Sequence, residues 1–401
     1  MPRLLARRIV AIDPTGPAPA LEQWRTVVPE HPGRMIEGFA LAGGLIVSHE
    51  LERATSHLRC YAMDGTAGGE LELPAPGSVV GLAGEEEGEL VLAGFTSFAV
   101  PPSLFAWDLA SRRRWPVSPL PLAPGFDPAT IVVEQVEYPS RDGTPISMFV
   151  VHWRGLAPTG EQPTVLTGYG GFNISLGPHY NPALPAWLER GGVLALPNLR
   201  GGGEYGEAWH RAGMLGRKQN VFDDVIAAAE WLIESGYTSV QKLAIAGGSN
   251  GGLLVGEAIT QRPDLFRAAL CEVPLLDMLR YHRFRIARLW IPEYGSAEEA
   301  DAFGWLHAYS PYHRVAAGVC YPATLLTTGE RDSRVDPLHA RKMAALLQQA
   351  TGCLTERPIL LRAEADAGHG QGKPLAKRVA EAADSWGFLG WHLGVDWDAA
   401  G

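Results

Sequence analysis

The sequence contains few lysines and no basic region. Only five of its 34 basic residues are lysines, and the densest basic cluster is residues 112–114. With 44 acidic residues, the formal net charge at pH 7 is −10. Because nucleic-acid binding requires a basic face, this composition excludes a nucleic-acid partner. The acidic balance favours solubility and indicates nothing more specific.

Long uncharged apolar runs are also absent. No stretch approaches the roughly 20 residues of a membrane-spanning helix, so the sequence predicts no membrane segment. The first 14 residues carry Arg3, Arg7 and Arg8 and lack the apolar core of about 7–15 residues found in secretion signals. We therefore expect a cytoplasmic protein.

Cysteine is scarce, with four residues that lie far apart and match no zinc-binding spacing. Without a secretion signal, we expect all four to be buried thiols. They are Cys60, Cys271, Cys320 and Cys353. HExxH motifs and Walker loops are also absent, so the sequence predicts neither a metal nor a cofactor.

By contrast, glycine and proline are abundant, with 47 and 31 residues. Apolar residues make up 46% of the 401-residue chain and charged residues 19%, which is typical of globular domains with a sizeable core. At about 150 residues per domain, the length predicts two or three domains. The many glycines and prolines indicate numerous turns and short strands.

Residues 1–128 have the pattern of short strands separated by turns. Six strands are expected, at 35–41, 45–51, 57–63, 78–82, 89–95 and 104–109. The Asp64-Gly65 pair is a typical hairpin turn, and helical periodicity is absent. The sequence predicts an all-β segment, either a small sandwich or part of a β-propeller. Six strands make about one and a half four-stranded blades, too few for a closed propeller.

Residues 129–401 alternate apolar strands with amphipathic helices. Strands are expected at 146–152, 164–167, 193–197, 243–246, 268–272, 324–327 and 359–362. Between them, residues 222–235 place apolar side chains on one helix face. This alternation predicts an α/β fold with a mostly parallel sheet and helices on both faces.

The most informative motif is the G-x-S-x-G of residues 247–251, between an apolar strand and an apolar helical run. In a nucleophile elbow, a serine occupies a strained strand-to-helix turn, and the flanking glycines allow close approach of neighbouring chains. In this context the motif predicts a hydrolase with Ser249 as its nucleophile. An ordinary turn serine is the alternative.

A serine nucleophile needs a general base oriented by an acid. In α/β-hydrolases the acid precedes the histidine and follows the serine. Three acidic candidates come after the strand at 324–327: Glu330, Asp332 and Asp336. We favour Asp332, because Asp336 stands where the helix at 337–347 needs an N-cap.

His369 is the predicted base. It lies between two glycines in the loop after the strand at 359–362, an unusual setting for a packed histidine. The remaining histidines after Ser249 lie in periodic or Tyr/Pro-rich contexts, and we interpret them as structural. They are His282, His307, His313, His339 and His392.

Residues 201–206 spell G-x-G-x-x-G after a strand, and Asp223 follows 20 residues beyond Gly203, a pattern similar to a dinucleotide-binding fingerprint. However, the next helix is expected near Phe222 rather than directly after the third glycine. A pyrophosphate would then lack its helix N-terminus, so we expect no dinucleotide cofactor.

A series of segments in the α/β part resembles the prolyl oligopeptidase family of serine peptidases and covers about residues 130–397. The segments are 169–175, 198–207, 218–224, 247–252, 261–266, 277–279 and 367–370. The resemblance implies a catalytic triad of Ser249, Asp332 and His369. It also implies an oxyanion hole formed by the Tyr169 hydroxyl and the Asn250 backbone N–H.

The resemblance further implies a pocket for the substrate proline. In it, Trp290 would stack on the proline ring, and Arg334 would bind the carbonyl of the preceding substrate residue. A core aromatic is the less favoured alternative for Trp290, and a surface ion pair is the less favoured alternative for Arg334. The other expected pocket residues are Phe172, Asn250, Leu275, Tyr294 and Val335.

One departure from the family is large. Its members usually carry a seven-bladed propeller that caps the active site, whereas residues 1–128 resemble only the last blades. The chain is therefore either a fragment or a natural short form without the cap. Unpaired propeller edges would favour a homo-oligomer.

The sequence thus predicts a serine peptidase that cleaves after proline in short peptides through an acyl-enzyme. A carboxylesterase acting on small acyl or aryl esters is the first alternative, because the same groups cleave esters. A non-catalytic binding module is the second, and the complete set of catalytic residues disfavours it.

Overall fold

The computed structural model describes residues 7–13, 15, 20–118, 122, 126–370 and 372–398. These residues form two compact units. The first unit extends to Thr130 and also contains Ser175–Pro185 and Gly203–Trp209. The second contains Ile131–Ile174, Ala186–Gly202 and the residues from His210 onward.

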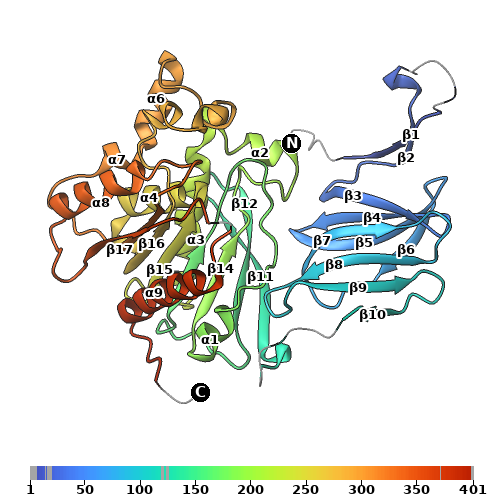
Figure 1. Ribbon diagram of the computed structural model, residues 1–401, viewed down its shortest axis with the longest axis horizontal. Helices are drawn as coiled ribbons and strands as arrows, with labels where there is room; N and C mark the ends of the chain where they lie inside the picture. The colour runs from blue at the N-terminus through green and yellow to red at the C-terminus, as the bar shows by residue number, and fades with distance from the viewer. Residues whose placement is uncertain are drawn as a thin grey trace. The chain divides into compact units, whose positions relative to one another are not determined.

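The first unit consists of antiparallel strands (Figure 1). A two-stranded ribbon pairs β1 (Ile9–Ala11) with β2 (Arg25–Val28), with the 3-10 turn η1 (Leu21–Gln23) between them. One four-stranded sheet contains β3 (Arg34–Ala42), β4 (Leu45–Glu52), β5 (Thr55–Ala62) and β6 (Ala67–Leu71). The other contains β7 (Ser78–Gly84), β8 (Leu90–Thr96), β9 (Ser103–Asp108) and β10 (Arg114–Pro116).

The expectation of six strands, and hence of one and a half blades, is wrong. The described residues contain two full four-stranded sheets, in which each strand pairs with the next one along the chain. β6 was missed because Gly68 and Gly69 lie in it and four of its five residues are exposed, so it lacks apolar alternation. β10 has only three residues. Both strands depend on pairing with a neighbour rather than on a local pattern.

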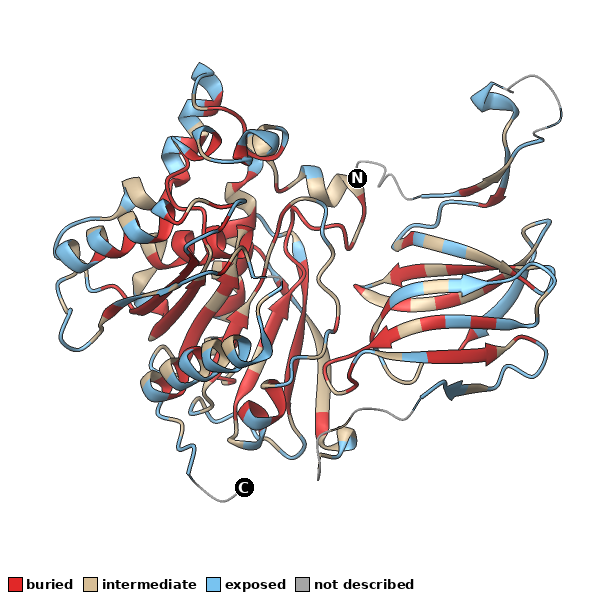
Figure 2. Cartoon of the chain, in the orientation of Figure 1, coloured by how far each residue is buried: buried red, intermediate tan, exposed pale blue. Residues whose placement is uncertain are grey.

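The two four-stranded sheets share one hydrophobic core, which appears as buried strand residues in Figure 2. Val47 and Leu58 of the first sheet and Val91, Phe95 and Trp107 of the second are fully buried in it. Alternate side chains along each strand therefore point into the shared core, which is how sheets in β-propellers and sandwiches pack.

The second unit is built on an eight-stranded sheet of order β11-β12-β14-β13-β15-β16-β17-β18. β12 pairs antiparallel with β11 and β14, and all later pairs are parallel. The strands are β11 (Ile131–Pro139), β12 (Pro145–Trp153), β13 (Thr164–Thr167), β14 (Val193–Pro197), β15 (Leu243–Gly248), β16 (Ala268–Glu272), β17 (Ala323–Gly329) and β18 (Ile359–Glu364).

Helices cover both faces of this sheet (Figure 1). α9 packs on β15, β16 and β17, and its Trp386 contacts Trp187 of α1. α3 and α4 pack together on the other face. The α-helices are α1 (Leu184–Glu189), α2 (Glu207–Arg211), α3 (Gln219–Glu234), α4 (Asn250–Gln261), α5 (Ile291–Tyr294), α6 (Ala300–Tyr309), α7 (Pro311–Arg314), α8 (Leu338–Ala350) and α9 (Leu375–Leu393). The 3-10 turns are η2 (Pro128–Thr130), η3 (Leu215–Arg217), η4 (Pro263–Leu265), η5 (Tyr281–Arg283) and η6 (Ala287–Trp290).

The predicted fold class, a mostly parallel α/β sheet with helices on both faces preceded by an all-β part, is confirmed.

The expectation about the first helix after the glycine-rich segment is wrong. The five-residue helix α2 begins directly after Gly206, so the first helix after the glycine-rich segment does not start near Phe222. None of the helices in the described ranges combines the length and the apolarity that crossing a bilayer requires.

Cys320 and Cys353 form a disulfide with their Cα atoms 5.2 Å apart. The expectation of four thiols is therefore wrong for this pair, whereas Cys60 and Cys271 are buried and free. The two half-cystines are 33 residues apart, and their segments are held together by two backbone hydrogen bonds, from the Gly352 N–H to the Val319 carbonyl at 2.9 Å and from the Gly318 N–H to the Ala350 carbonyl at 2.7 Å. Local spacing carries no signal for such a pair, because tertiary contacts bring its segments together.

We predict that the double variant Cys320→Ser/Cys353→Ser unfolds more easily in urea than the wild type. Closing a loop of 33 residues contributes about 3–4 kcal/mol in the chain-entropy description. A reductant should destabilise the wild type and leave the double variant unchanged. Thiol titration of the denatured, unreduced wild type should find two reactive thiols, and four would contradict the disulfide.

Candidate active site

Ser249 occupies the turn between β15 and α4. Its φ is 59° and its ψ is −118°, a backbone conformation that residues with a side chain rarely adopt. The turn is held by hydrogen bonds on both sides: the Ser249 N–H donates to the Glu272 carbonyl at 2.9 Å, and the Gly252 N–H donates to the Ser249 carbonyl at 2.9 Å. These hydrogen bonds hold the Ser249 backbone in a strained conformation, as is common at functional sites.

The two glycines of the motif are required by close backbone contacts. A Cβ on Gly247 would lie 2.5 Å from the carbonyl oxygen of Gly251. A Cβ on Gly251 would lie 2.7 Å from the carbonyl oxygen of Gly168. These positions therefore exclude any side chain, and the elbow packs directly on the loop that follows β13.

Asp332 and His369 lie in the loops that follow β17 and β18. The Nδ1 atom of His369 is 2.6 Å from Oδ2 of Asp332. The other carboxylate oxygen, Oδ1, accepts the N–H groups of Arg334 at 2.8 Å and Val335 at 2.9 Å. The Asp332 side chain is fully buried and His369 is partly exposed. This is the arrangement in which a fixed carboxylate orients an imidazole base.

The two rejected acids have other contacts. Glu330 is exposed and pairs with Arg341 at 3.4 Å. Asp336 accepts the Leu338 N–H at 3.0 Å at the start of α8, and its other oxygen pairs with Arg285 at 2.9 Å. Asp336 therefore has the helix-starting role that its sequence position suggested.

The Tyr169 side chain approaches the serine from the loop after β13. The Ser249 side chain acts on the Tyr169 hydroxyl as a hydrogen-bond partner, and both residues line the same cavity. Burial raises the pKa of the Tyr169 phenol, while the Ser249 hydrogen bond acts to lower it. The phenol is therefore protonated at neutral pH and can donate a hydrogen bond. Asn250, the other predicted oxyanion donor, is the first residue of α4, whose initial N–H groups have no acceptor within the helix.

A cavity of about 210 Å³ lies beside Ser249. Phe172 and Trp290 form one wall, with their ring centroids 6.4 Å apart in an edge-to-face arrangement. The lining residues are Tyr169, Phe172, Ile174, Ser249, Leu275, Leu289, Trp290 and Arg334. The structure therefore places four of the predicted substrate-binding residues, Phe172, Leu275, Trp290 and Arg334, around the serine.

Tyr294 and Val335, also predicted for the pocket, are not among its lining residues. Both are buried. Tyr294 packs edge-on against Phe172 at 5.5 Å, and its hydroxyl donates to Oδ1 of Asn250 at 2.7 Å. Val335 lies beside the carboxylate of Asp332. They support the pocket from behind rather than form its surface.

Trp290 and Arg334 both line the cavity beside Ser249. Trp290 is partly exposed in the cavity wall rather than in the core. Arg334 is exposed, lines the cavity and acts electrostatically on Tyr169. Among the described residues, Arg334 belongs to no ion pair.

Sequence reasoning missed Ile174 and Leu289, which line the cavity and are 45% and 73% exposed. The sequence contained only weak indications that these two residues line a site. Ile174 lies within the segment 169–175, and Leu289 is an apolar residue directly before Trp290.

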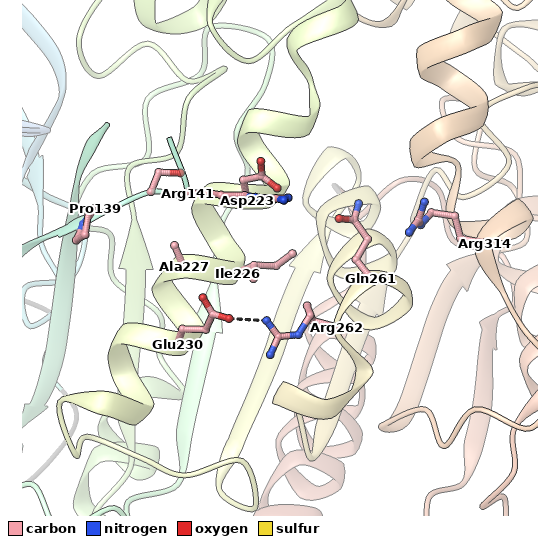
Figure 3. Close-up of a pocket in the computed structure, with 10 residues that line it drawn as sticks. Pro139, Arg141, Asp223, Ile226, Ala227, Glu230, Gln261, Arg262 and Arg314 are labelled. Carbon is pink, nitrogen blue, oxygen red and sulfur yellow. Dashed lines mark hydrogen bonds and ion pairs between the residues drawn. The ribbon is translucent and has the colours of Figure 1, made fainter. Parts of the chain in front are cut away.

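A second cavity, of about 430 Å³, lies beside α3 and the end of α4 (Figure 3). Four of its five charged side chains have protein partners within the described part of the chain, the exception being Arg141. Arg262 pairs with Glu230 and, at 2.8 Å, with Asp264. Asp223 accepts a hydrogen bond from Gln219 at 2.9 Å, and Arg314 donates to a backbone carbonyl at 2.7 Å. We therefore assign this cavity no part in the candidate site.

Within the ranges described, no cluster of His, Cys, Asp or Glu side chains could hold a metal ion.

The fold, with Ser249 at a strand-to-helix turn and the Asp332–His369 pair in the loops after β17 and β18, is that of the α/β-hydrolase class. The family model of the prolyl oligopeptidase family matches residues 178–396, and that of the N-terminal β-propeller domain of prolyl oligopeptidase matches residues 4–119. The chain belongs to the prolyl oligopeptidase family, so the resemblance seen in the sequence is confirmed.

The chain is 41% identical to the prolyl endopeptidase of Elizabethkingia miricola over 380 residues, which are 94% of this chain and 53% of that protein. Among solved structures, one from a study of two prolyl endopeptidases superimposes with a TM-score of 0.90 at 44% identity, covering 97% of this chain and 57% of that one. Prolyl oligopeptidase B of Galerina marginata, bound to a 35-residue hydrolysis and macrocyclization substrate, gives a TM-score of 0.89 at 32% identity, covering 94% and 53%. The chain thus spans about half the length of the curated relatives it matches.

We predict that Asp332→Asn lowers kcat for an aryl ester by about 10³- to 10⁴-fold, because an amide cannot hold the His369 ring in the required tautomer. The fold should be retained, since the amide oxygen can still accept the Arg334 and Val335 N–H groups. Asp336→Asn is the matched control and should leave kcat within about twofold, since it removes only a surface ion pair. Equal losses in the two variants would contradict the assignment of the acid.

Proposed function

We propose that the protein is a serine peptidase that cleaves peptide bonds on the C-terminal side of proline in short peptides. One observation carries the proposal. The cavity beside Ser249 combines a hydroxyl donor, Tyr169, with an aromatic wall that contains Trp290. The relatives named prolyl endopeptidases support the same reaction.

The proposed reaction begins when the Ser249 Oγ attacks the substrate carbonyl carbon and its proton passes to His369. The Tyr169 hydroxyl and the Asn250 N–H stabilise the oxyanion. His369 then donates the proton to the leaving amine as the C–N bond breaks, which leaves an acyl-enzyme. Water, deprotonated by His369, hydrolyses the acyl ester and restores Ser249. Asp332 keeps the imidazole oriented throughout.

The proposed specificity comes from the shape and chemistry of the cavity. The flat Trp290 ring stacks on the proline ring, and Phe172 and Leu275 enclose it with apolar surface. Arg334, which is free of ion pairs among the described residues, donates to the carbonyl of the preceding substrate residue. Tyr294 and Val335 stabilise the arrangement from behind through Asn250 and Asp332.

We also propose that residues 129–401 form the catalytic domain and residues 1–128 an all-β domain that resembles propeller blades. Association into a homo-oligomer through the sheet edges is part of this proposal. The homo-oligomer is supported by Trp115 of the edge strand β10, which is 42% exposed.

Cytoplasmic residence stays a prediction, and the disulfide weighs against it because disulfides are rare in reducing compartments.

A carboxylesterase that uses the same groups on small acyl or aryl esters is the alternative. It is less favoured, because the aligned relatives are named as peptidases and because Trp290 and Arg334 suit a peptide. The non-catalytic binding module is disfavoured by the contacts between Ser249 and Tyr169 and between His369 and Asp332.

The proposal is tested by comparing kcat/KM for an N-blocked Gly-Pro anilide, the matching Gly-Ala anilide and an aryl acetate. We expect turnover of the proline anilide that clearly exceeds that of the alanine anilide. Ester hydrolysis with no detectable anilide hydrolysis would establish the esterase instead. Ser249→Ala should abolish all three activities while the protein stays folded, and residual activity near that of the wild type would overturn the nucleophile assignment.

We predict that Trp290→Ala lowers kcat/KM for the proline anilide by about 10- to 100-fold, because roughly 1.5–3 kcal/mol of apolar and stacking contact is lost. The acyl group of the aryl acetate is a methyl group with no proline-like ring to stack on Trp290, so this substrate should lose less than about threefold on the same reasoning. Trp391→Ala is the matched control, since Trp391 is 81% exposed on α9. Equal losses for the two substrates would rule out stacking.

A further inference from the structure

Two predicted functional side chains, Tyr169 and Phe172, lie on one short loop after β13. This loop, residues 169–174, has an unfavourable backbone conformation. Phe172 has a φ of 59° and Asn173 a φ of 56°, the left-handed region that residues with a Cβ rarely adopt. Such a conformation persists only where surrounding groups determine it. The position of the Tyr169 hydroxyl therefore depends on what holds this loop.

The backbone of the loop is held by groups from several distant segments. The side-chain amide of Asn250 donates to the Tyr169 carbonyl. The Nζ of Lys218 donates to the Gly170 carbonyl at 2.8 Å. The Phe172 N–H acts on the carboxylate of Glu293 as a hydrogen-bond donor, which lowers the pKa of that carboxyl. Lys218 and Glu293 thus act on two residues of the loop, Gly170 and Phe172, on either side of Gly171.

Lys218 and Glu293 also bind each other. The Nζ of Lys218 is 3.2 Å from Oε1 of Glu293, and Nε2 of His210 is 2.8 Å from Oε2. Lys218 is 1% exposed and Glu293 4%. Burial acts to raise the pKa of Glu293, but the His210 hydrogen bond, the Lys218 charge and the Phe172 N–H together lower it below its usual range. The carboxylate is therefore ionised in the interior.

Stability alone does not account for this buried pair. Removing two charges from water is costly, and well-packed apolar residues at such positions are often as stabilising or more so. The pair does provide directed hydrogen bonds to two points of a strained loop. Glu293 also lies in α5, directly before Tyr294 and three residues after Trp290. The pair therefore connects the Tyr169 loop to the aromatic wall of the cavity.

We propose that Lys218 and Glu293 are positioning residues, whose ion pair holds the loop 169–174 so that the Tyr169 hydroxyl faces the developing oxyanion and the Phe172 ring faces the substrate. This inference rests on the proposed function. The carbonyl of Gly170 is the point of attachment nearest to Tyr169, so losing the Lys218 ammonium should displace the hydroxyl. Losing the Glu293 carboxylate should displace Phe172.

The first test measures kcat for the aryl acetate in Lys218→Met, Glu293→Gln and the double variant. Complete loss of one oxyanion donor costs about 10²- to 10³-fold in kcat, so a displaced donor should cost about tenfold or more. The double variant carries no uncompensated buried charge, and its urea midpoint should return towards that of the wild type while its kcat stays low. Recovery of kcat together with stability would overturn the inference, because both effects would then follow from folding alone.

The second test compares Lys218→Met in the wild type and in Tyr169→Phe. If Lys218 acts through the Tyr169 hydroxyl, the substitution should change kcat by less than about twofold once that hydroxyl is absent, the non-additivity expected of coupled residues. The same fold-loss in both backgrounds would overturn the inference. Lys242→Met is the matched control, because the Nζ of Lys242 also donates to a backbone carbonyl, that of Leu393 at 2.9 Å, in the same unit. It should leave kcat unchanged.

A third measurement does not depend on activity. Hydrogen exchange in peptides that cover residues 168–174 should be faster in Lys218→Met and in the double variant than in the wild type and Lys242→Met. Unchanged exchange would overturn the inference even if the wild type hydrolysed none of the substrates. If the wild type cleaves the ester but not the proline anilide, the proposed peptidase function fails, and the ester kcat values still decide the role of the ion pair.

Discussion

The close packing of backbone around Ser249 is the constraint on which the rest of the site depends. The positive φ of the serine places its side chain at the start of α4, and the flanking glycines allow the turn to contact the Gly168 carbonyl with no side chain between them. That contact brings the loop of Tyr169 beside the serine. Because the parallel strands β15 and β17 end at the same edge of the sheet, the loop that carries Asp332 lies at this edge as well.

Some of the buried charges in the second unit hold loops in place. Asp332 accepts two backbone N–H groups in addition to the His369 ring. The same principle recurs with Arg200, whose buried guanidinium binds Asp224 at 2.6 Å and, on a turn, Asp142 at 2.6 Å. In each case a buried charge has several directed partners, which limits its desolvation cost and gives a loop a single conformation.

Much of the fold was predictable because local pattern and burial agree. β13, β14 and β16 have the limits that the apolar runs indicated, since they are buried on both faces of a parallel sheet. Strands whose apolar pattern is weak, such as β6 and β10, escaped detection. They form because a neighbouring strand offers unpaired backbone groups. The disulfide of Cys320 escaped for a similar reason, as its partner is distant in sequence.

The sequence by itself determined the family, the alternation of strands and helices in the α/β part, and the chemical types of the candidate site residues, because glycine spacing and apolar periodicity are local consequences of backbone geometry. Tertiary structure alone decided which of the candidate residues line the cavity and which lie behind it. It placed Tyr294 behind the cavity and Leu289 at its surface, and it joined Lys218 to Glu293 across 75 residues of chain. Such contacts depend on how distant loops meet at one sheet edge, which no local pattern encodes.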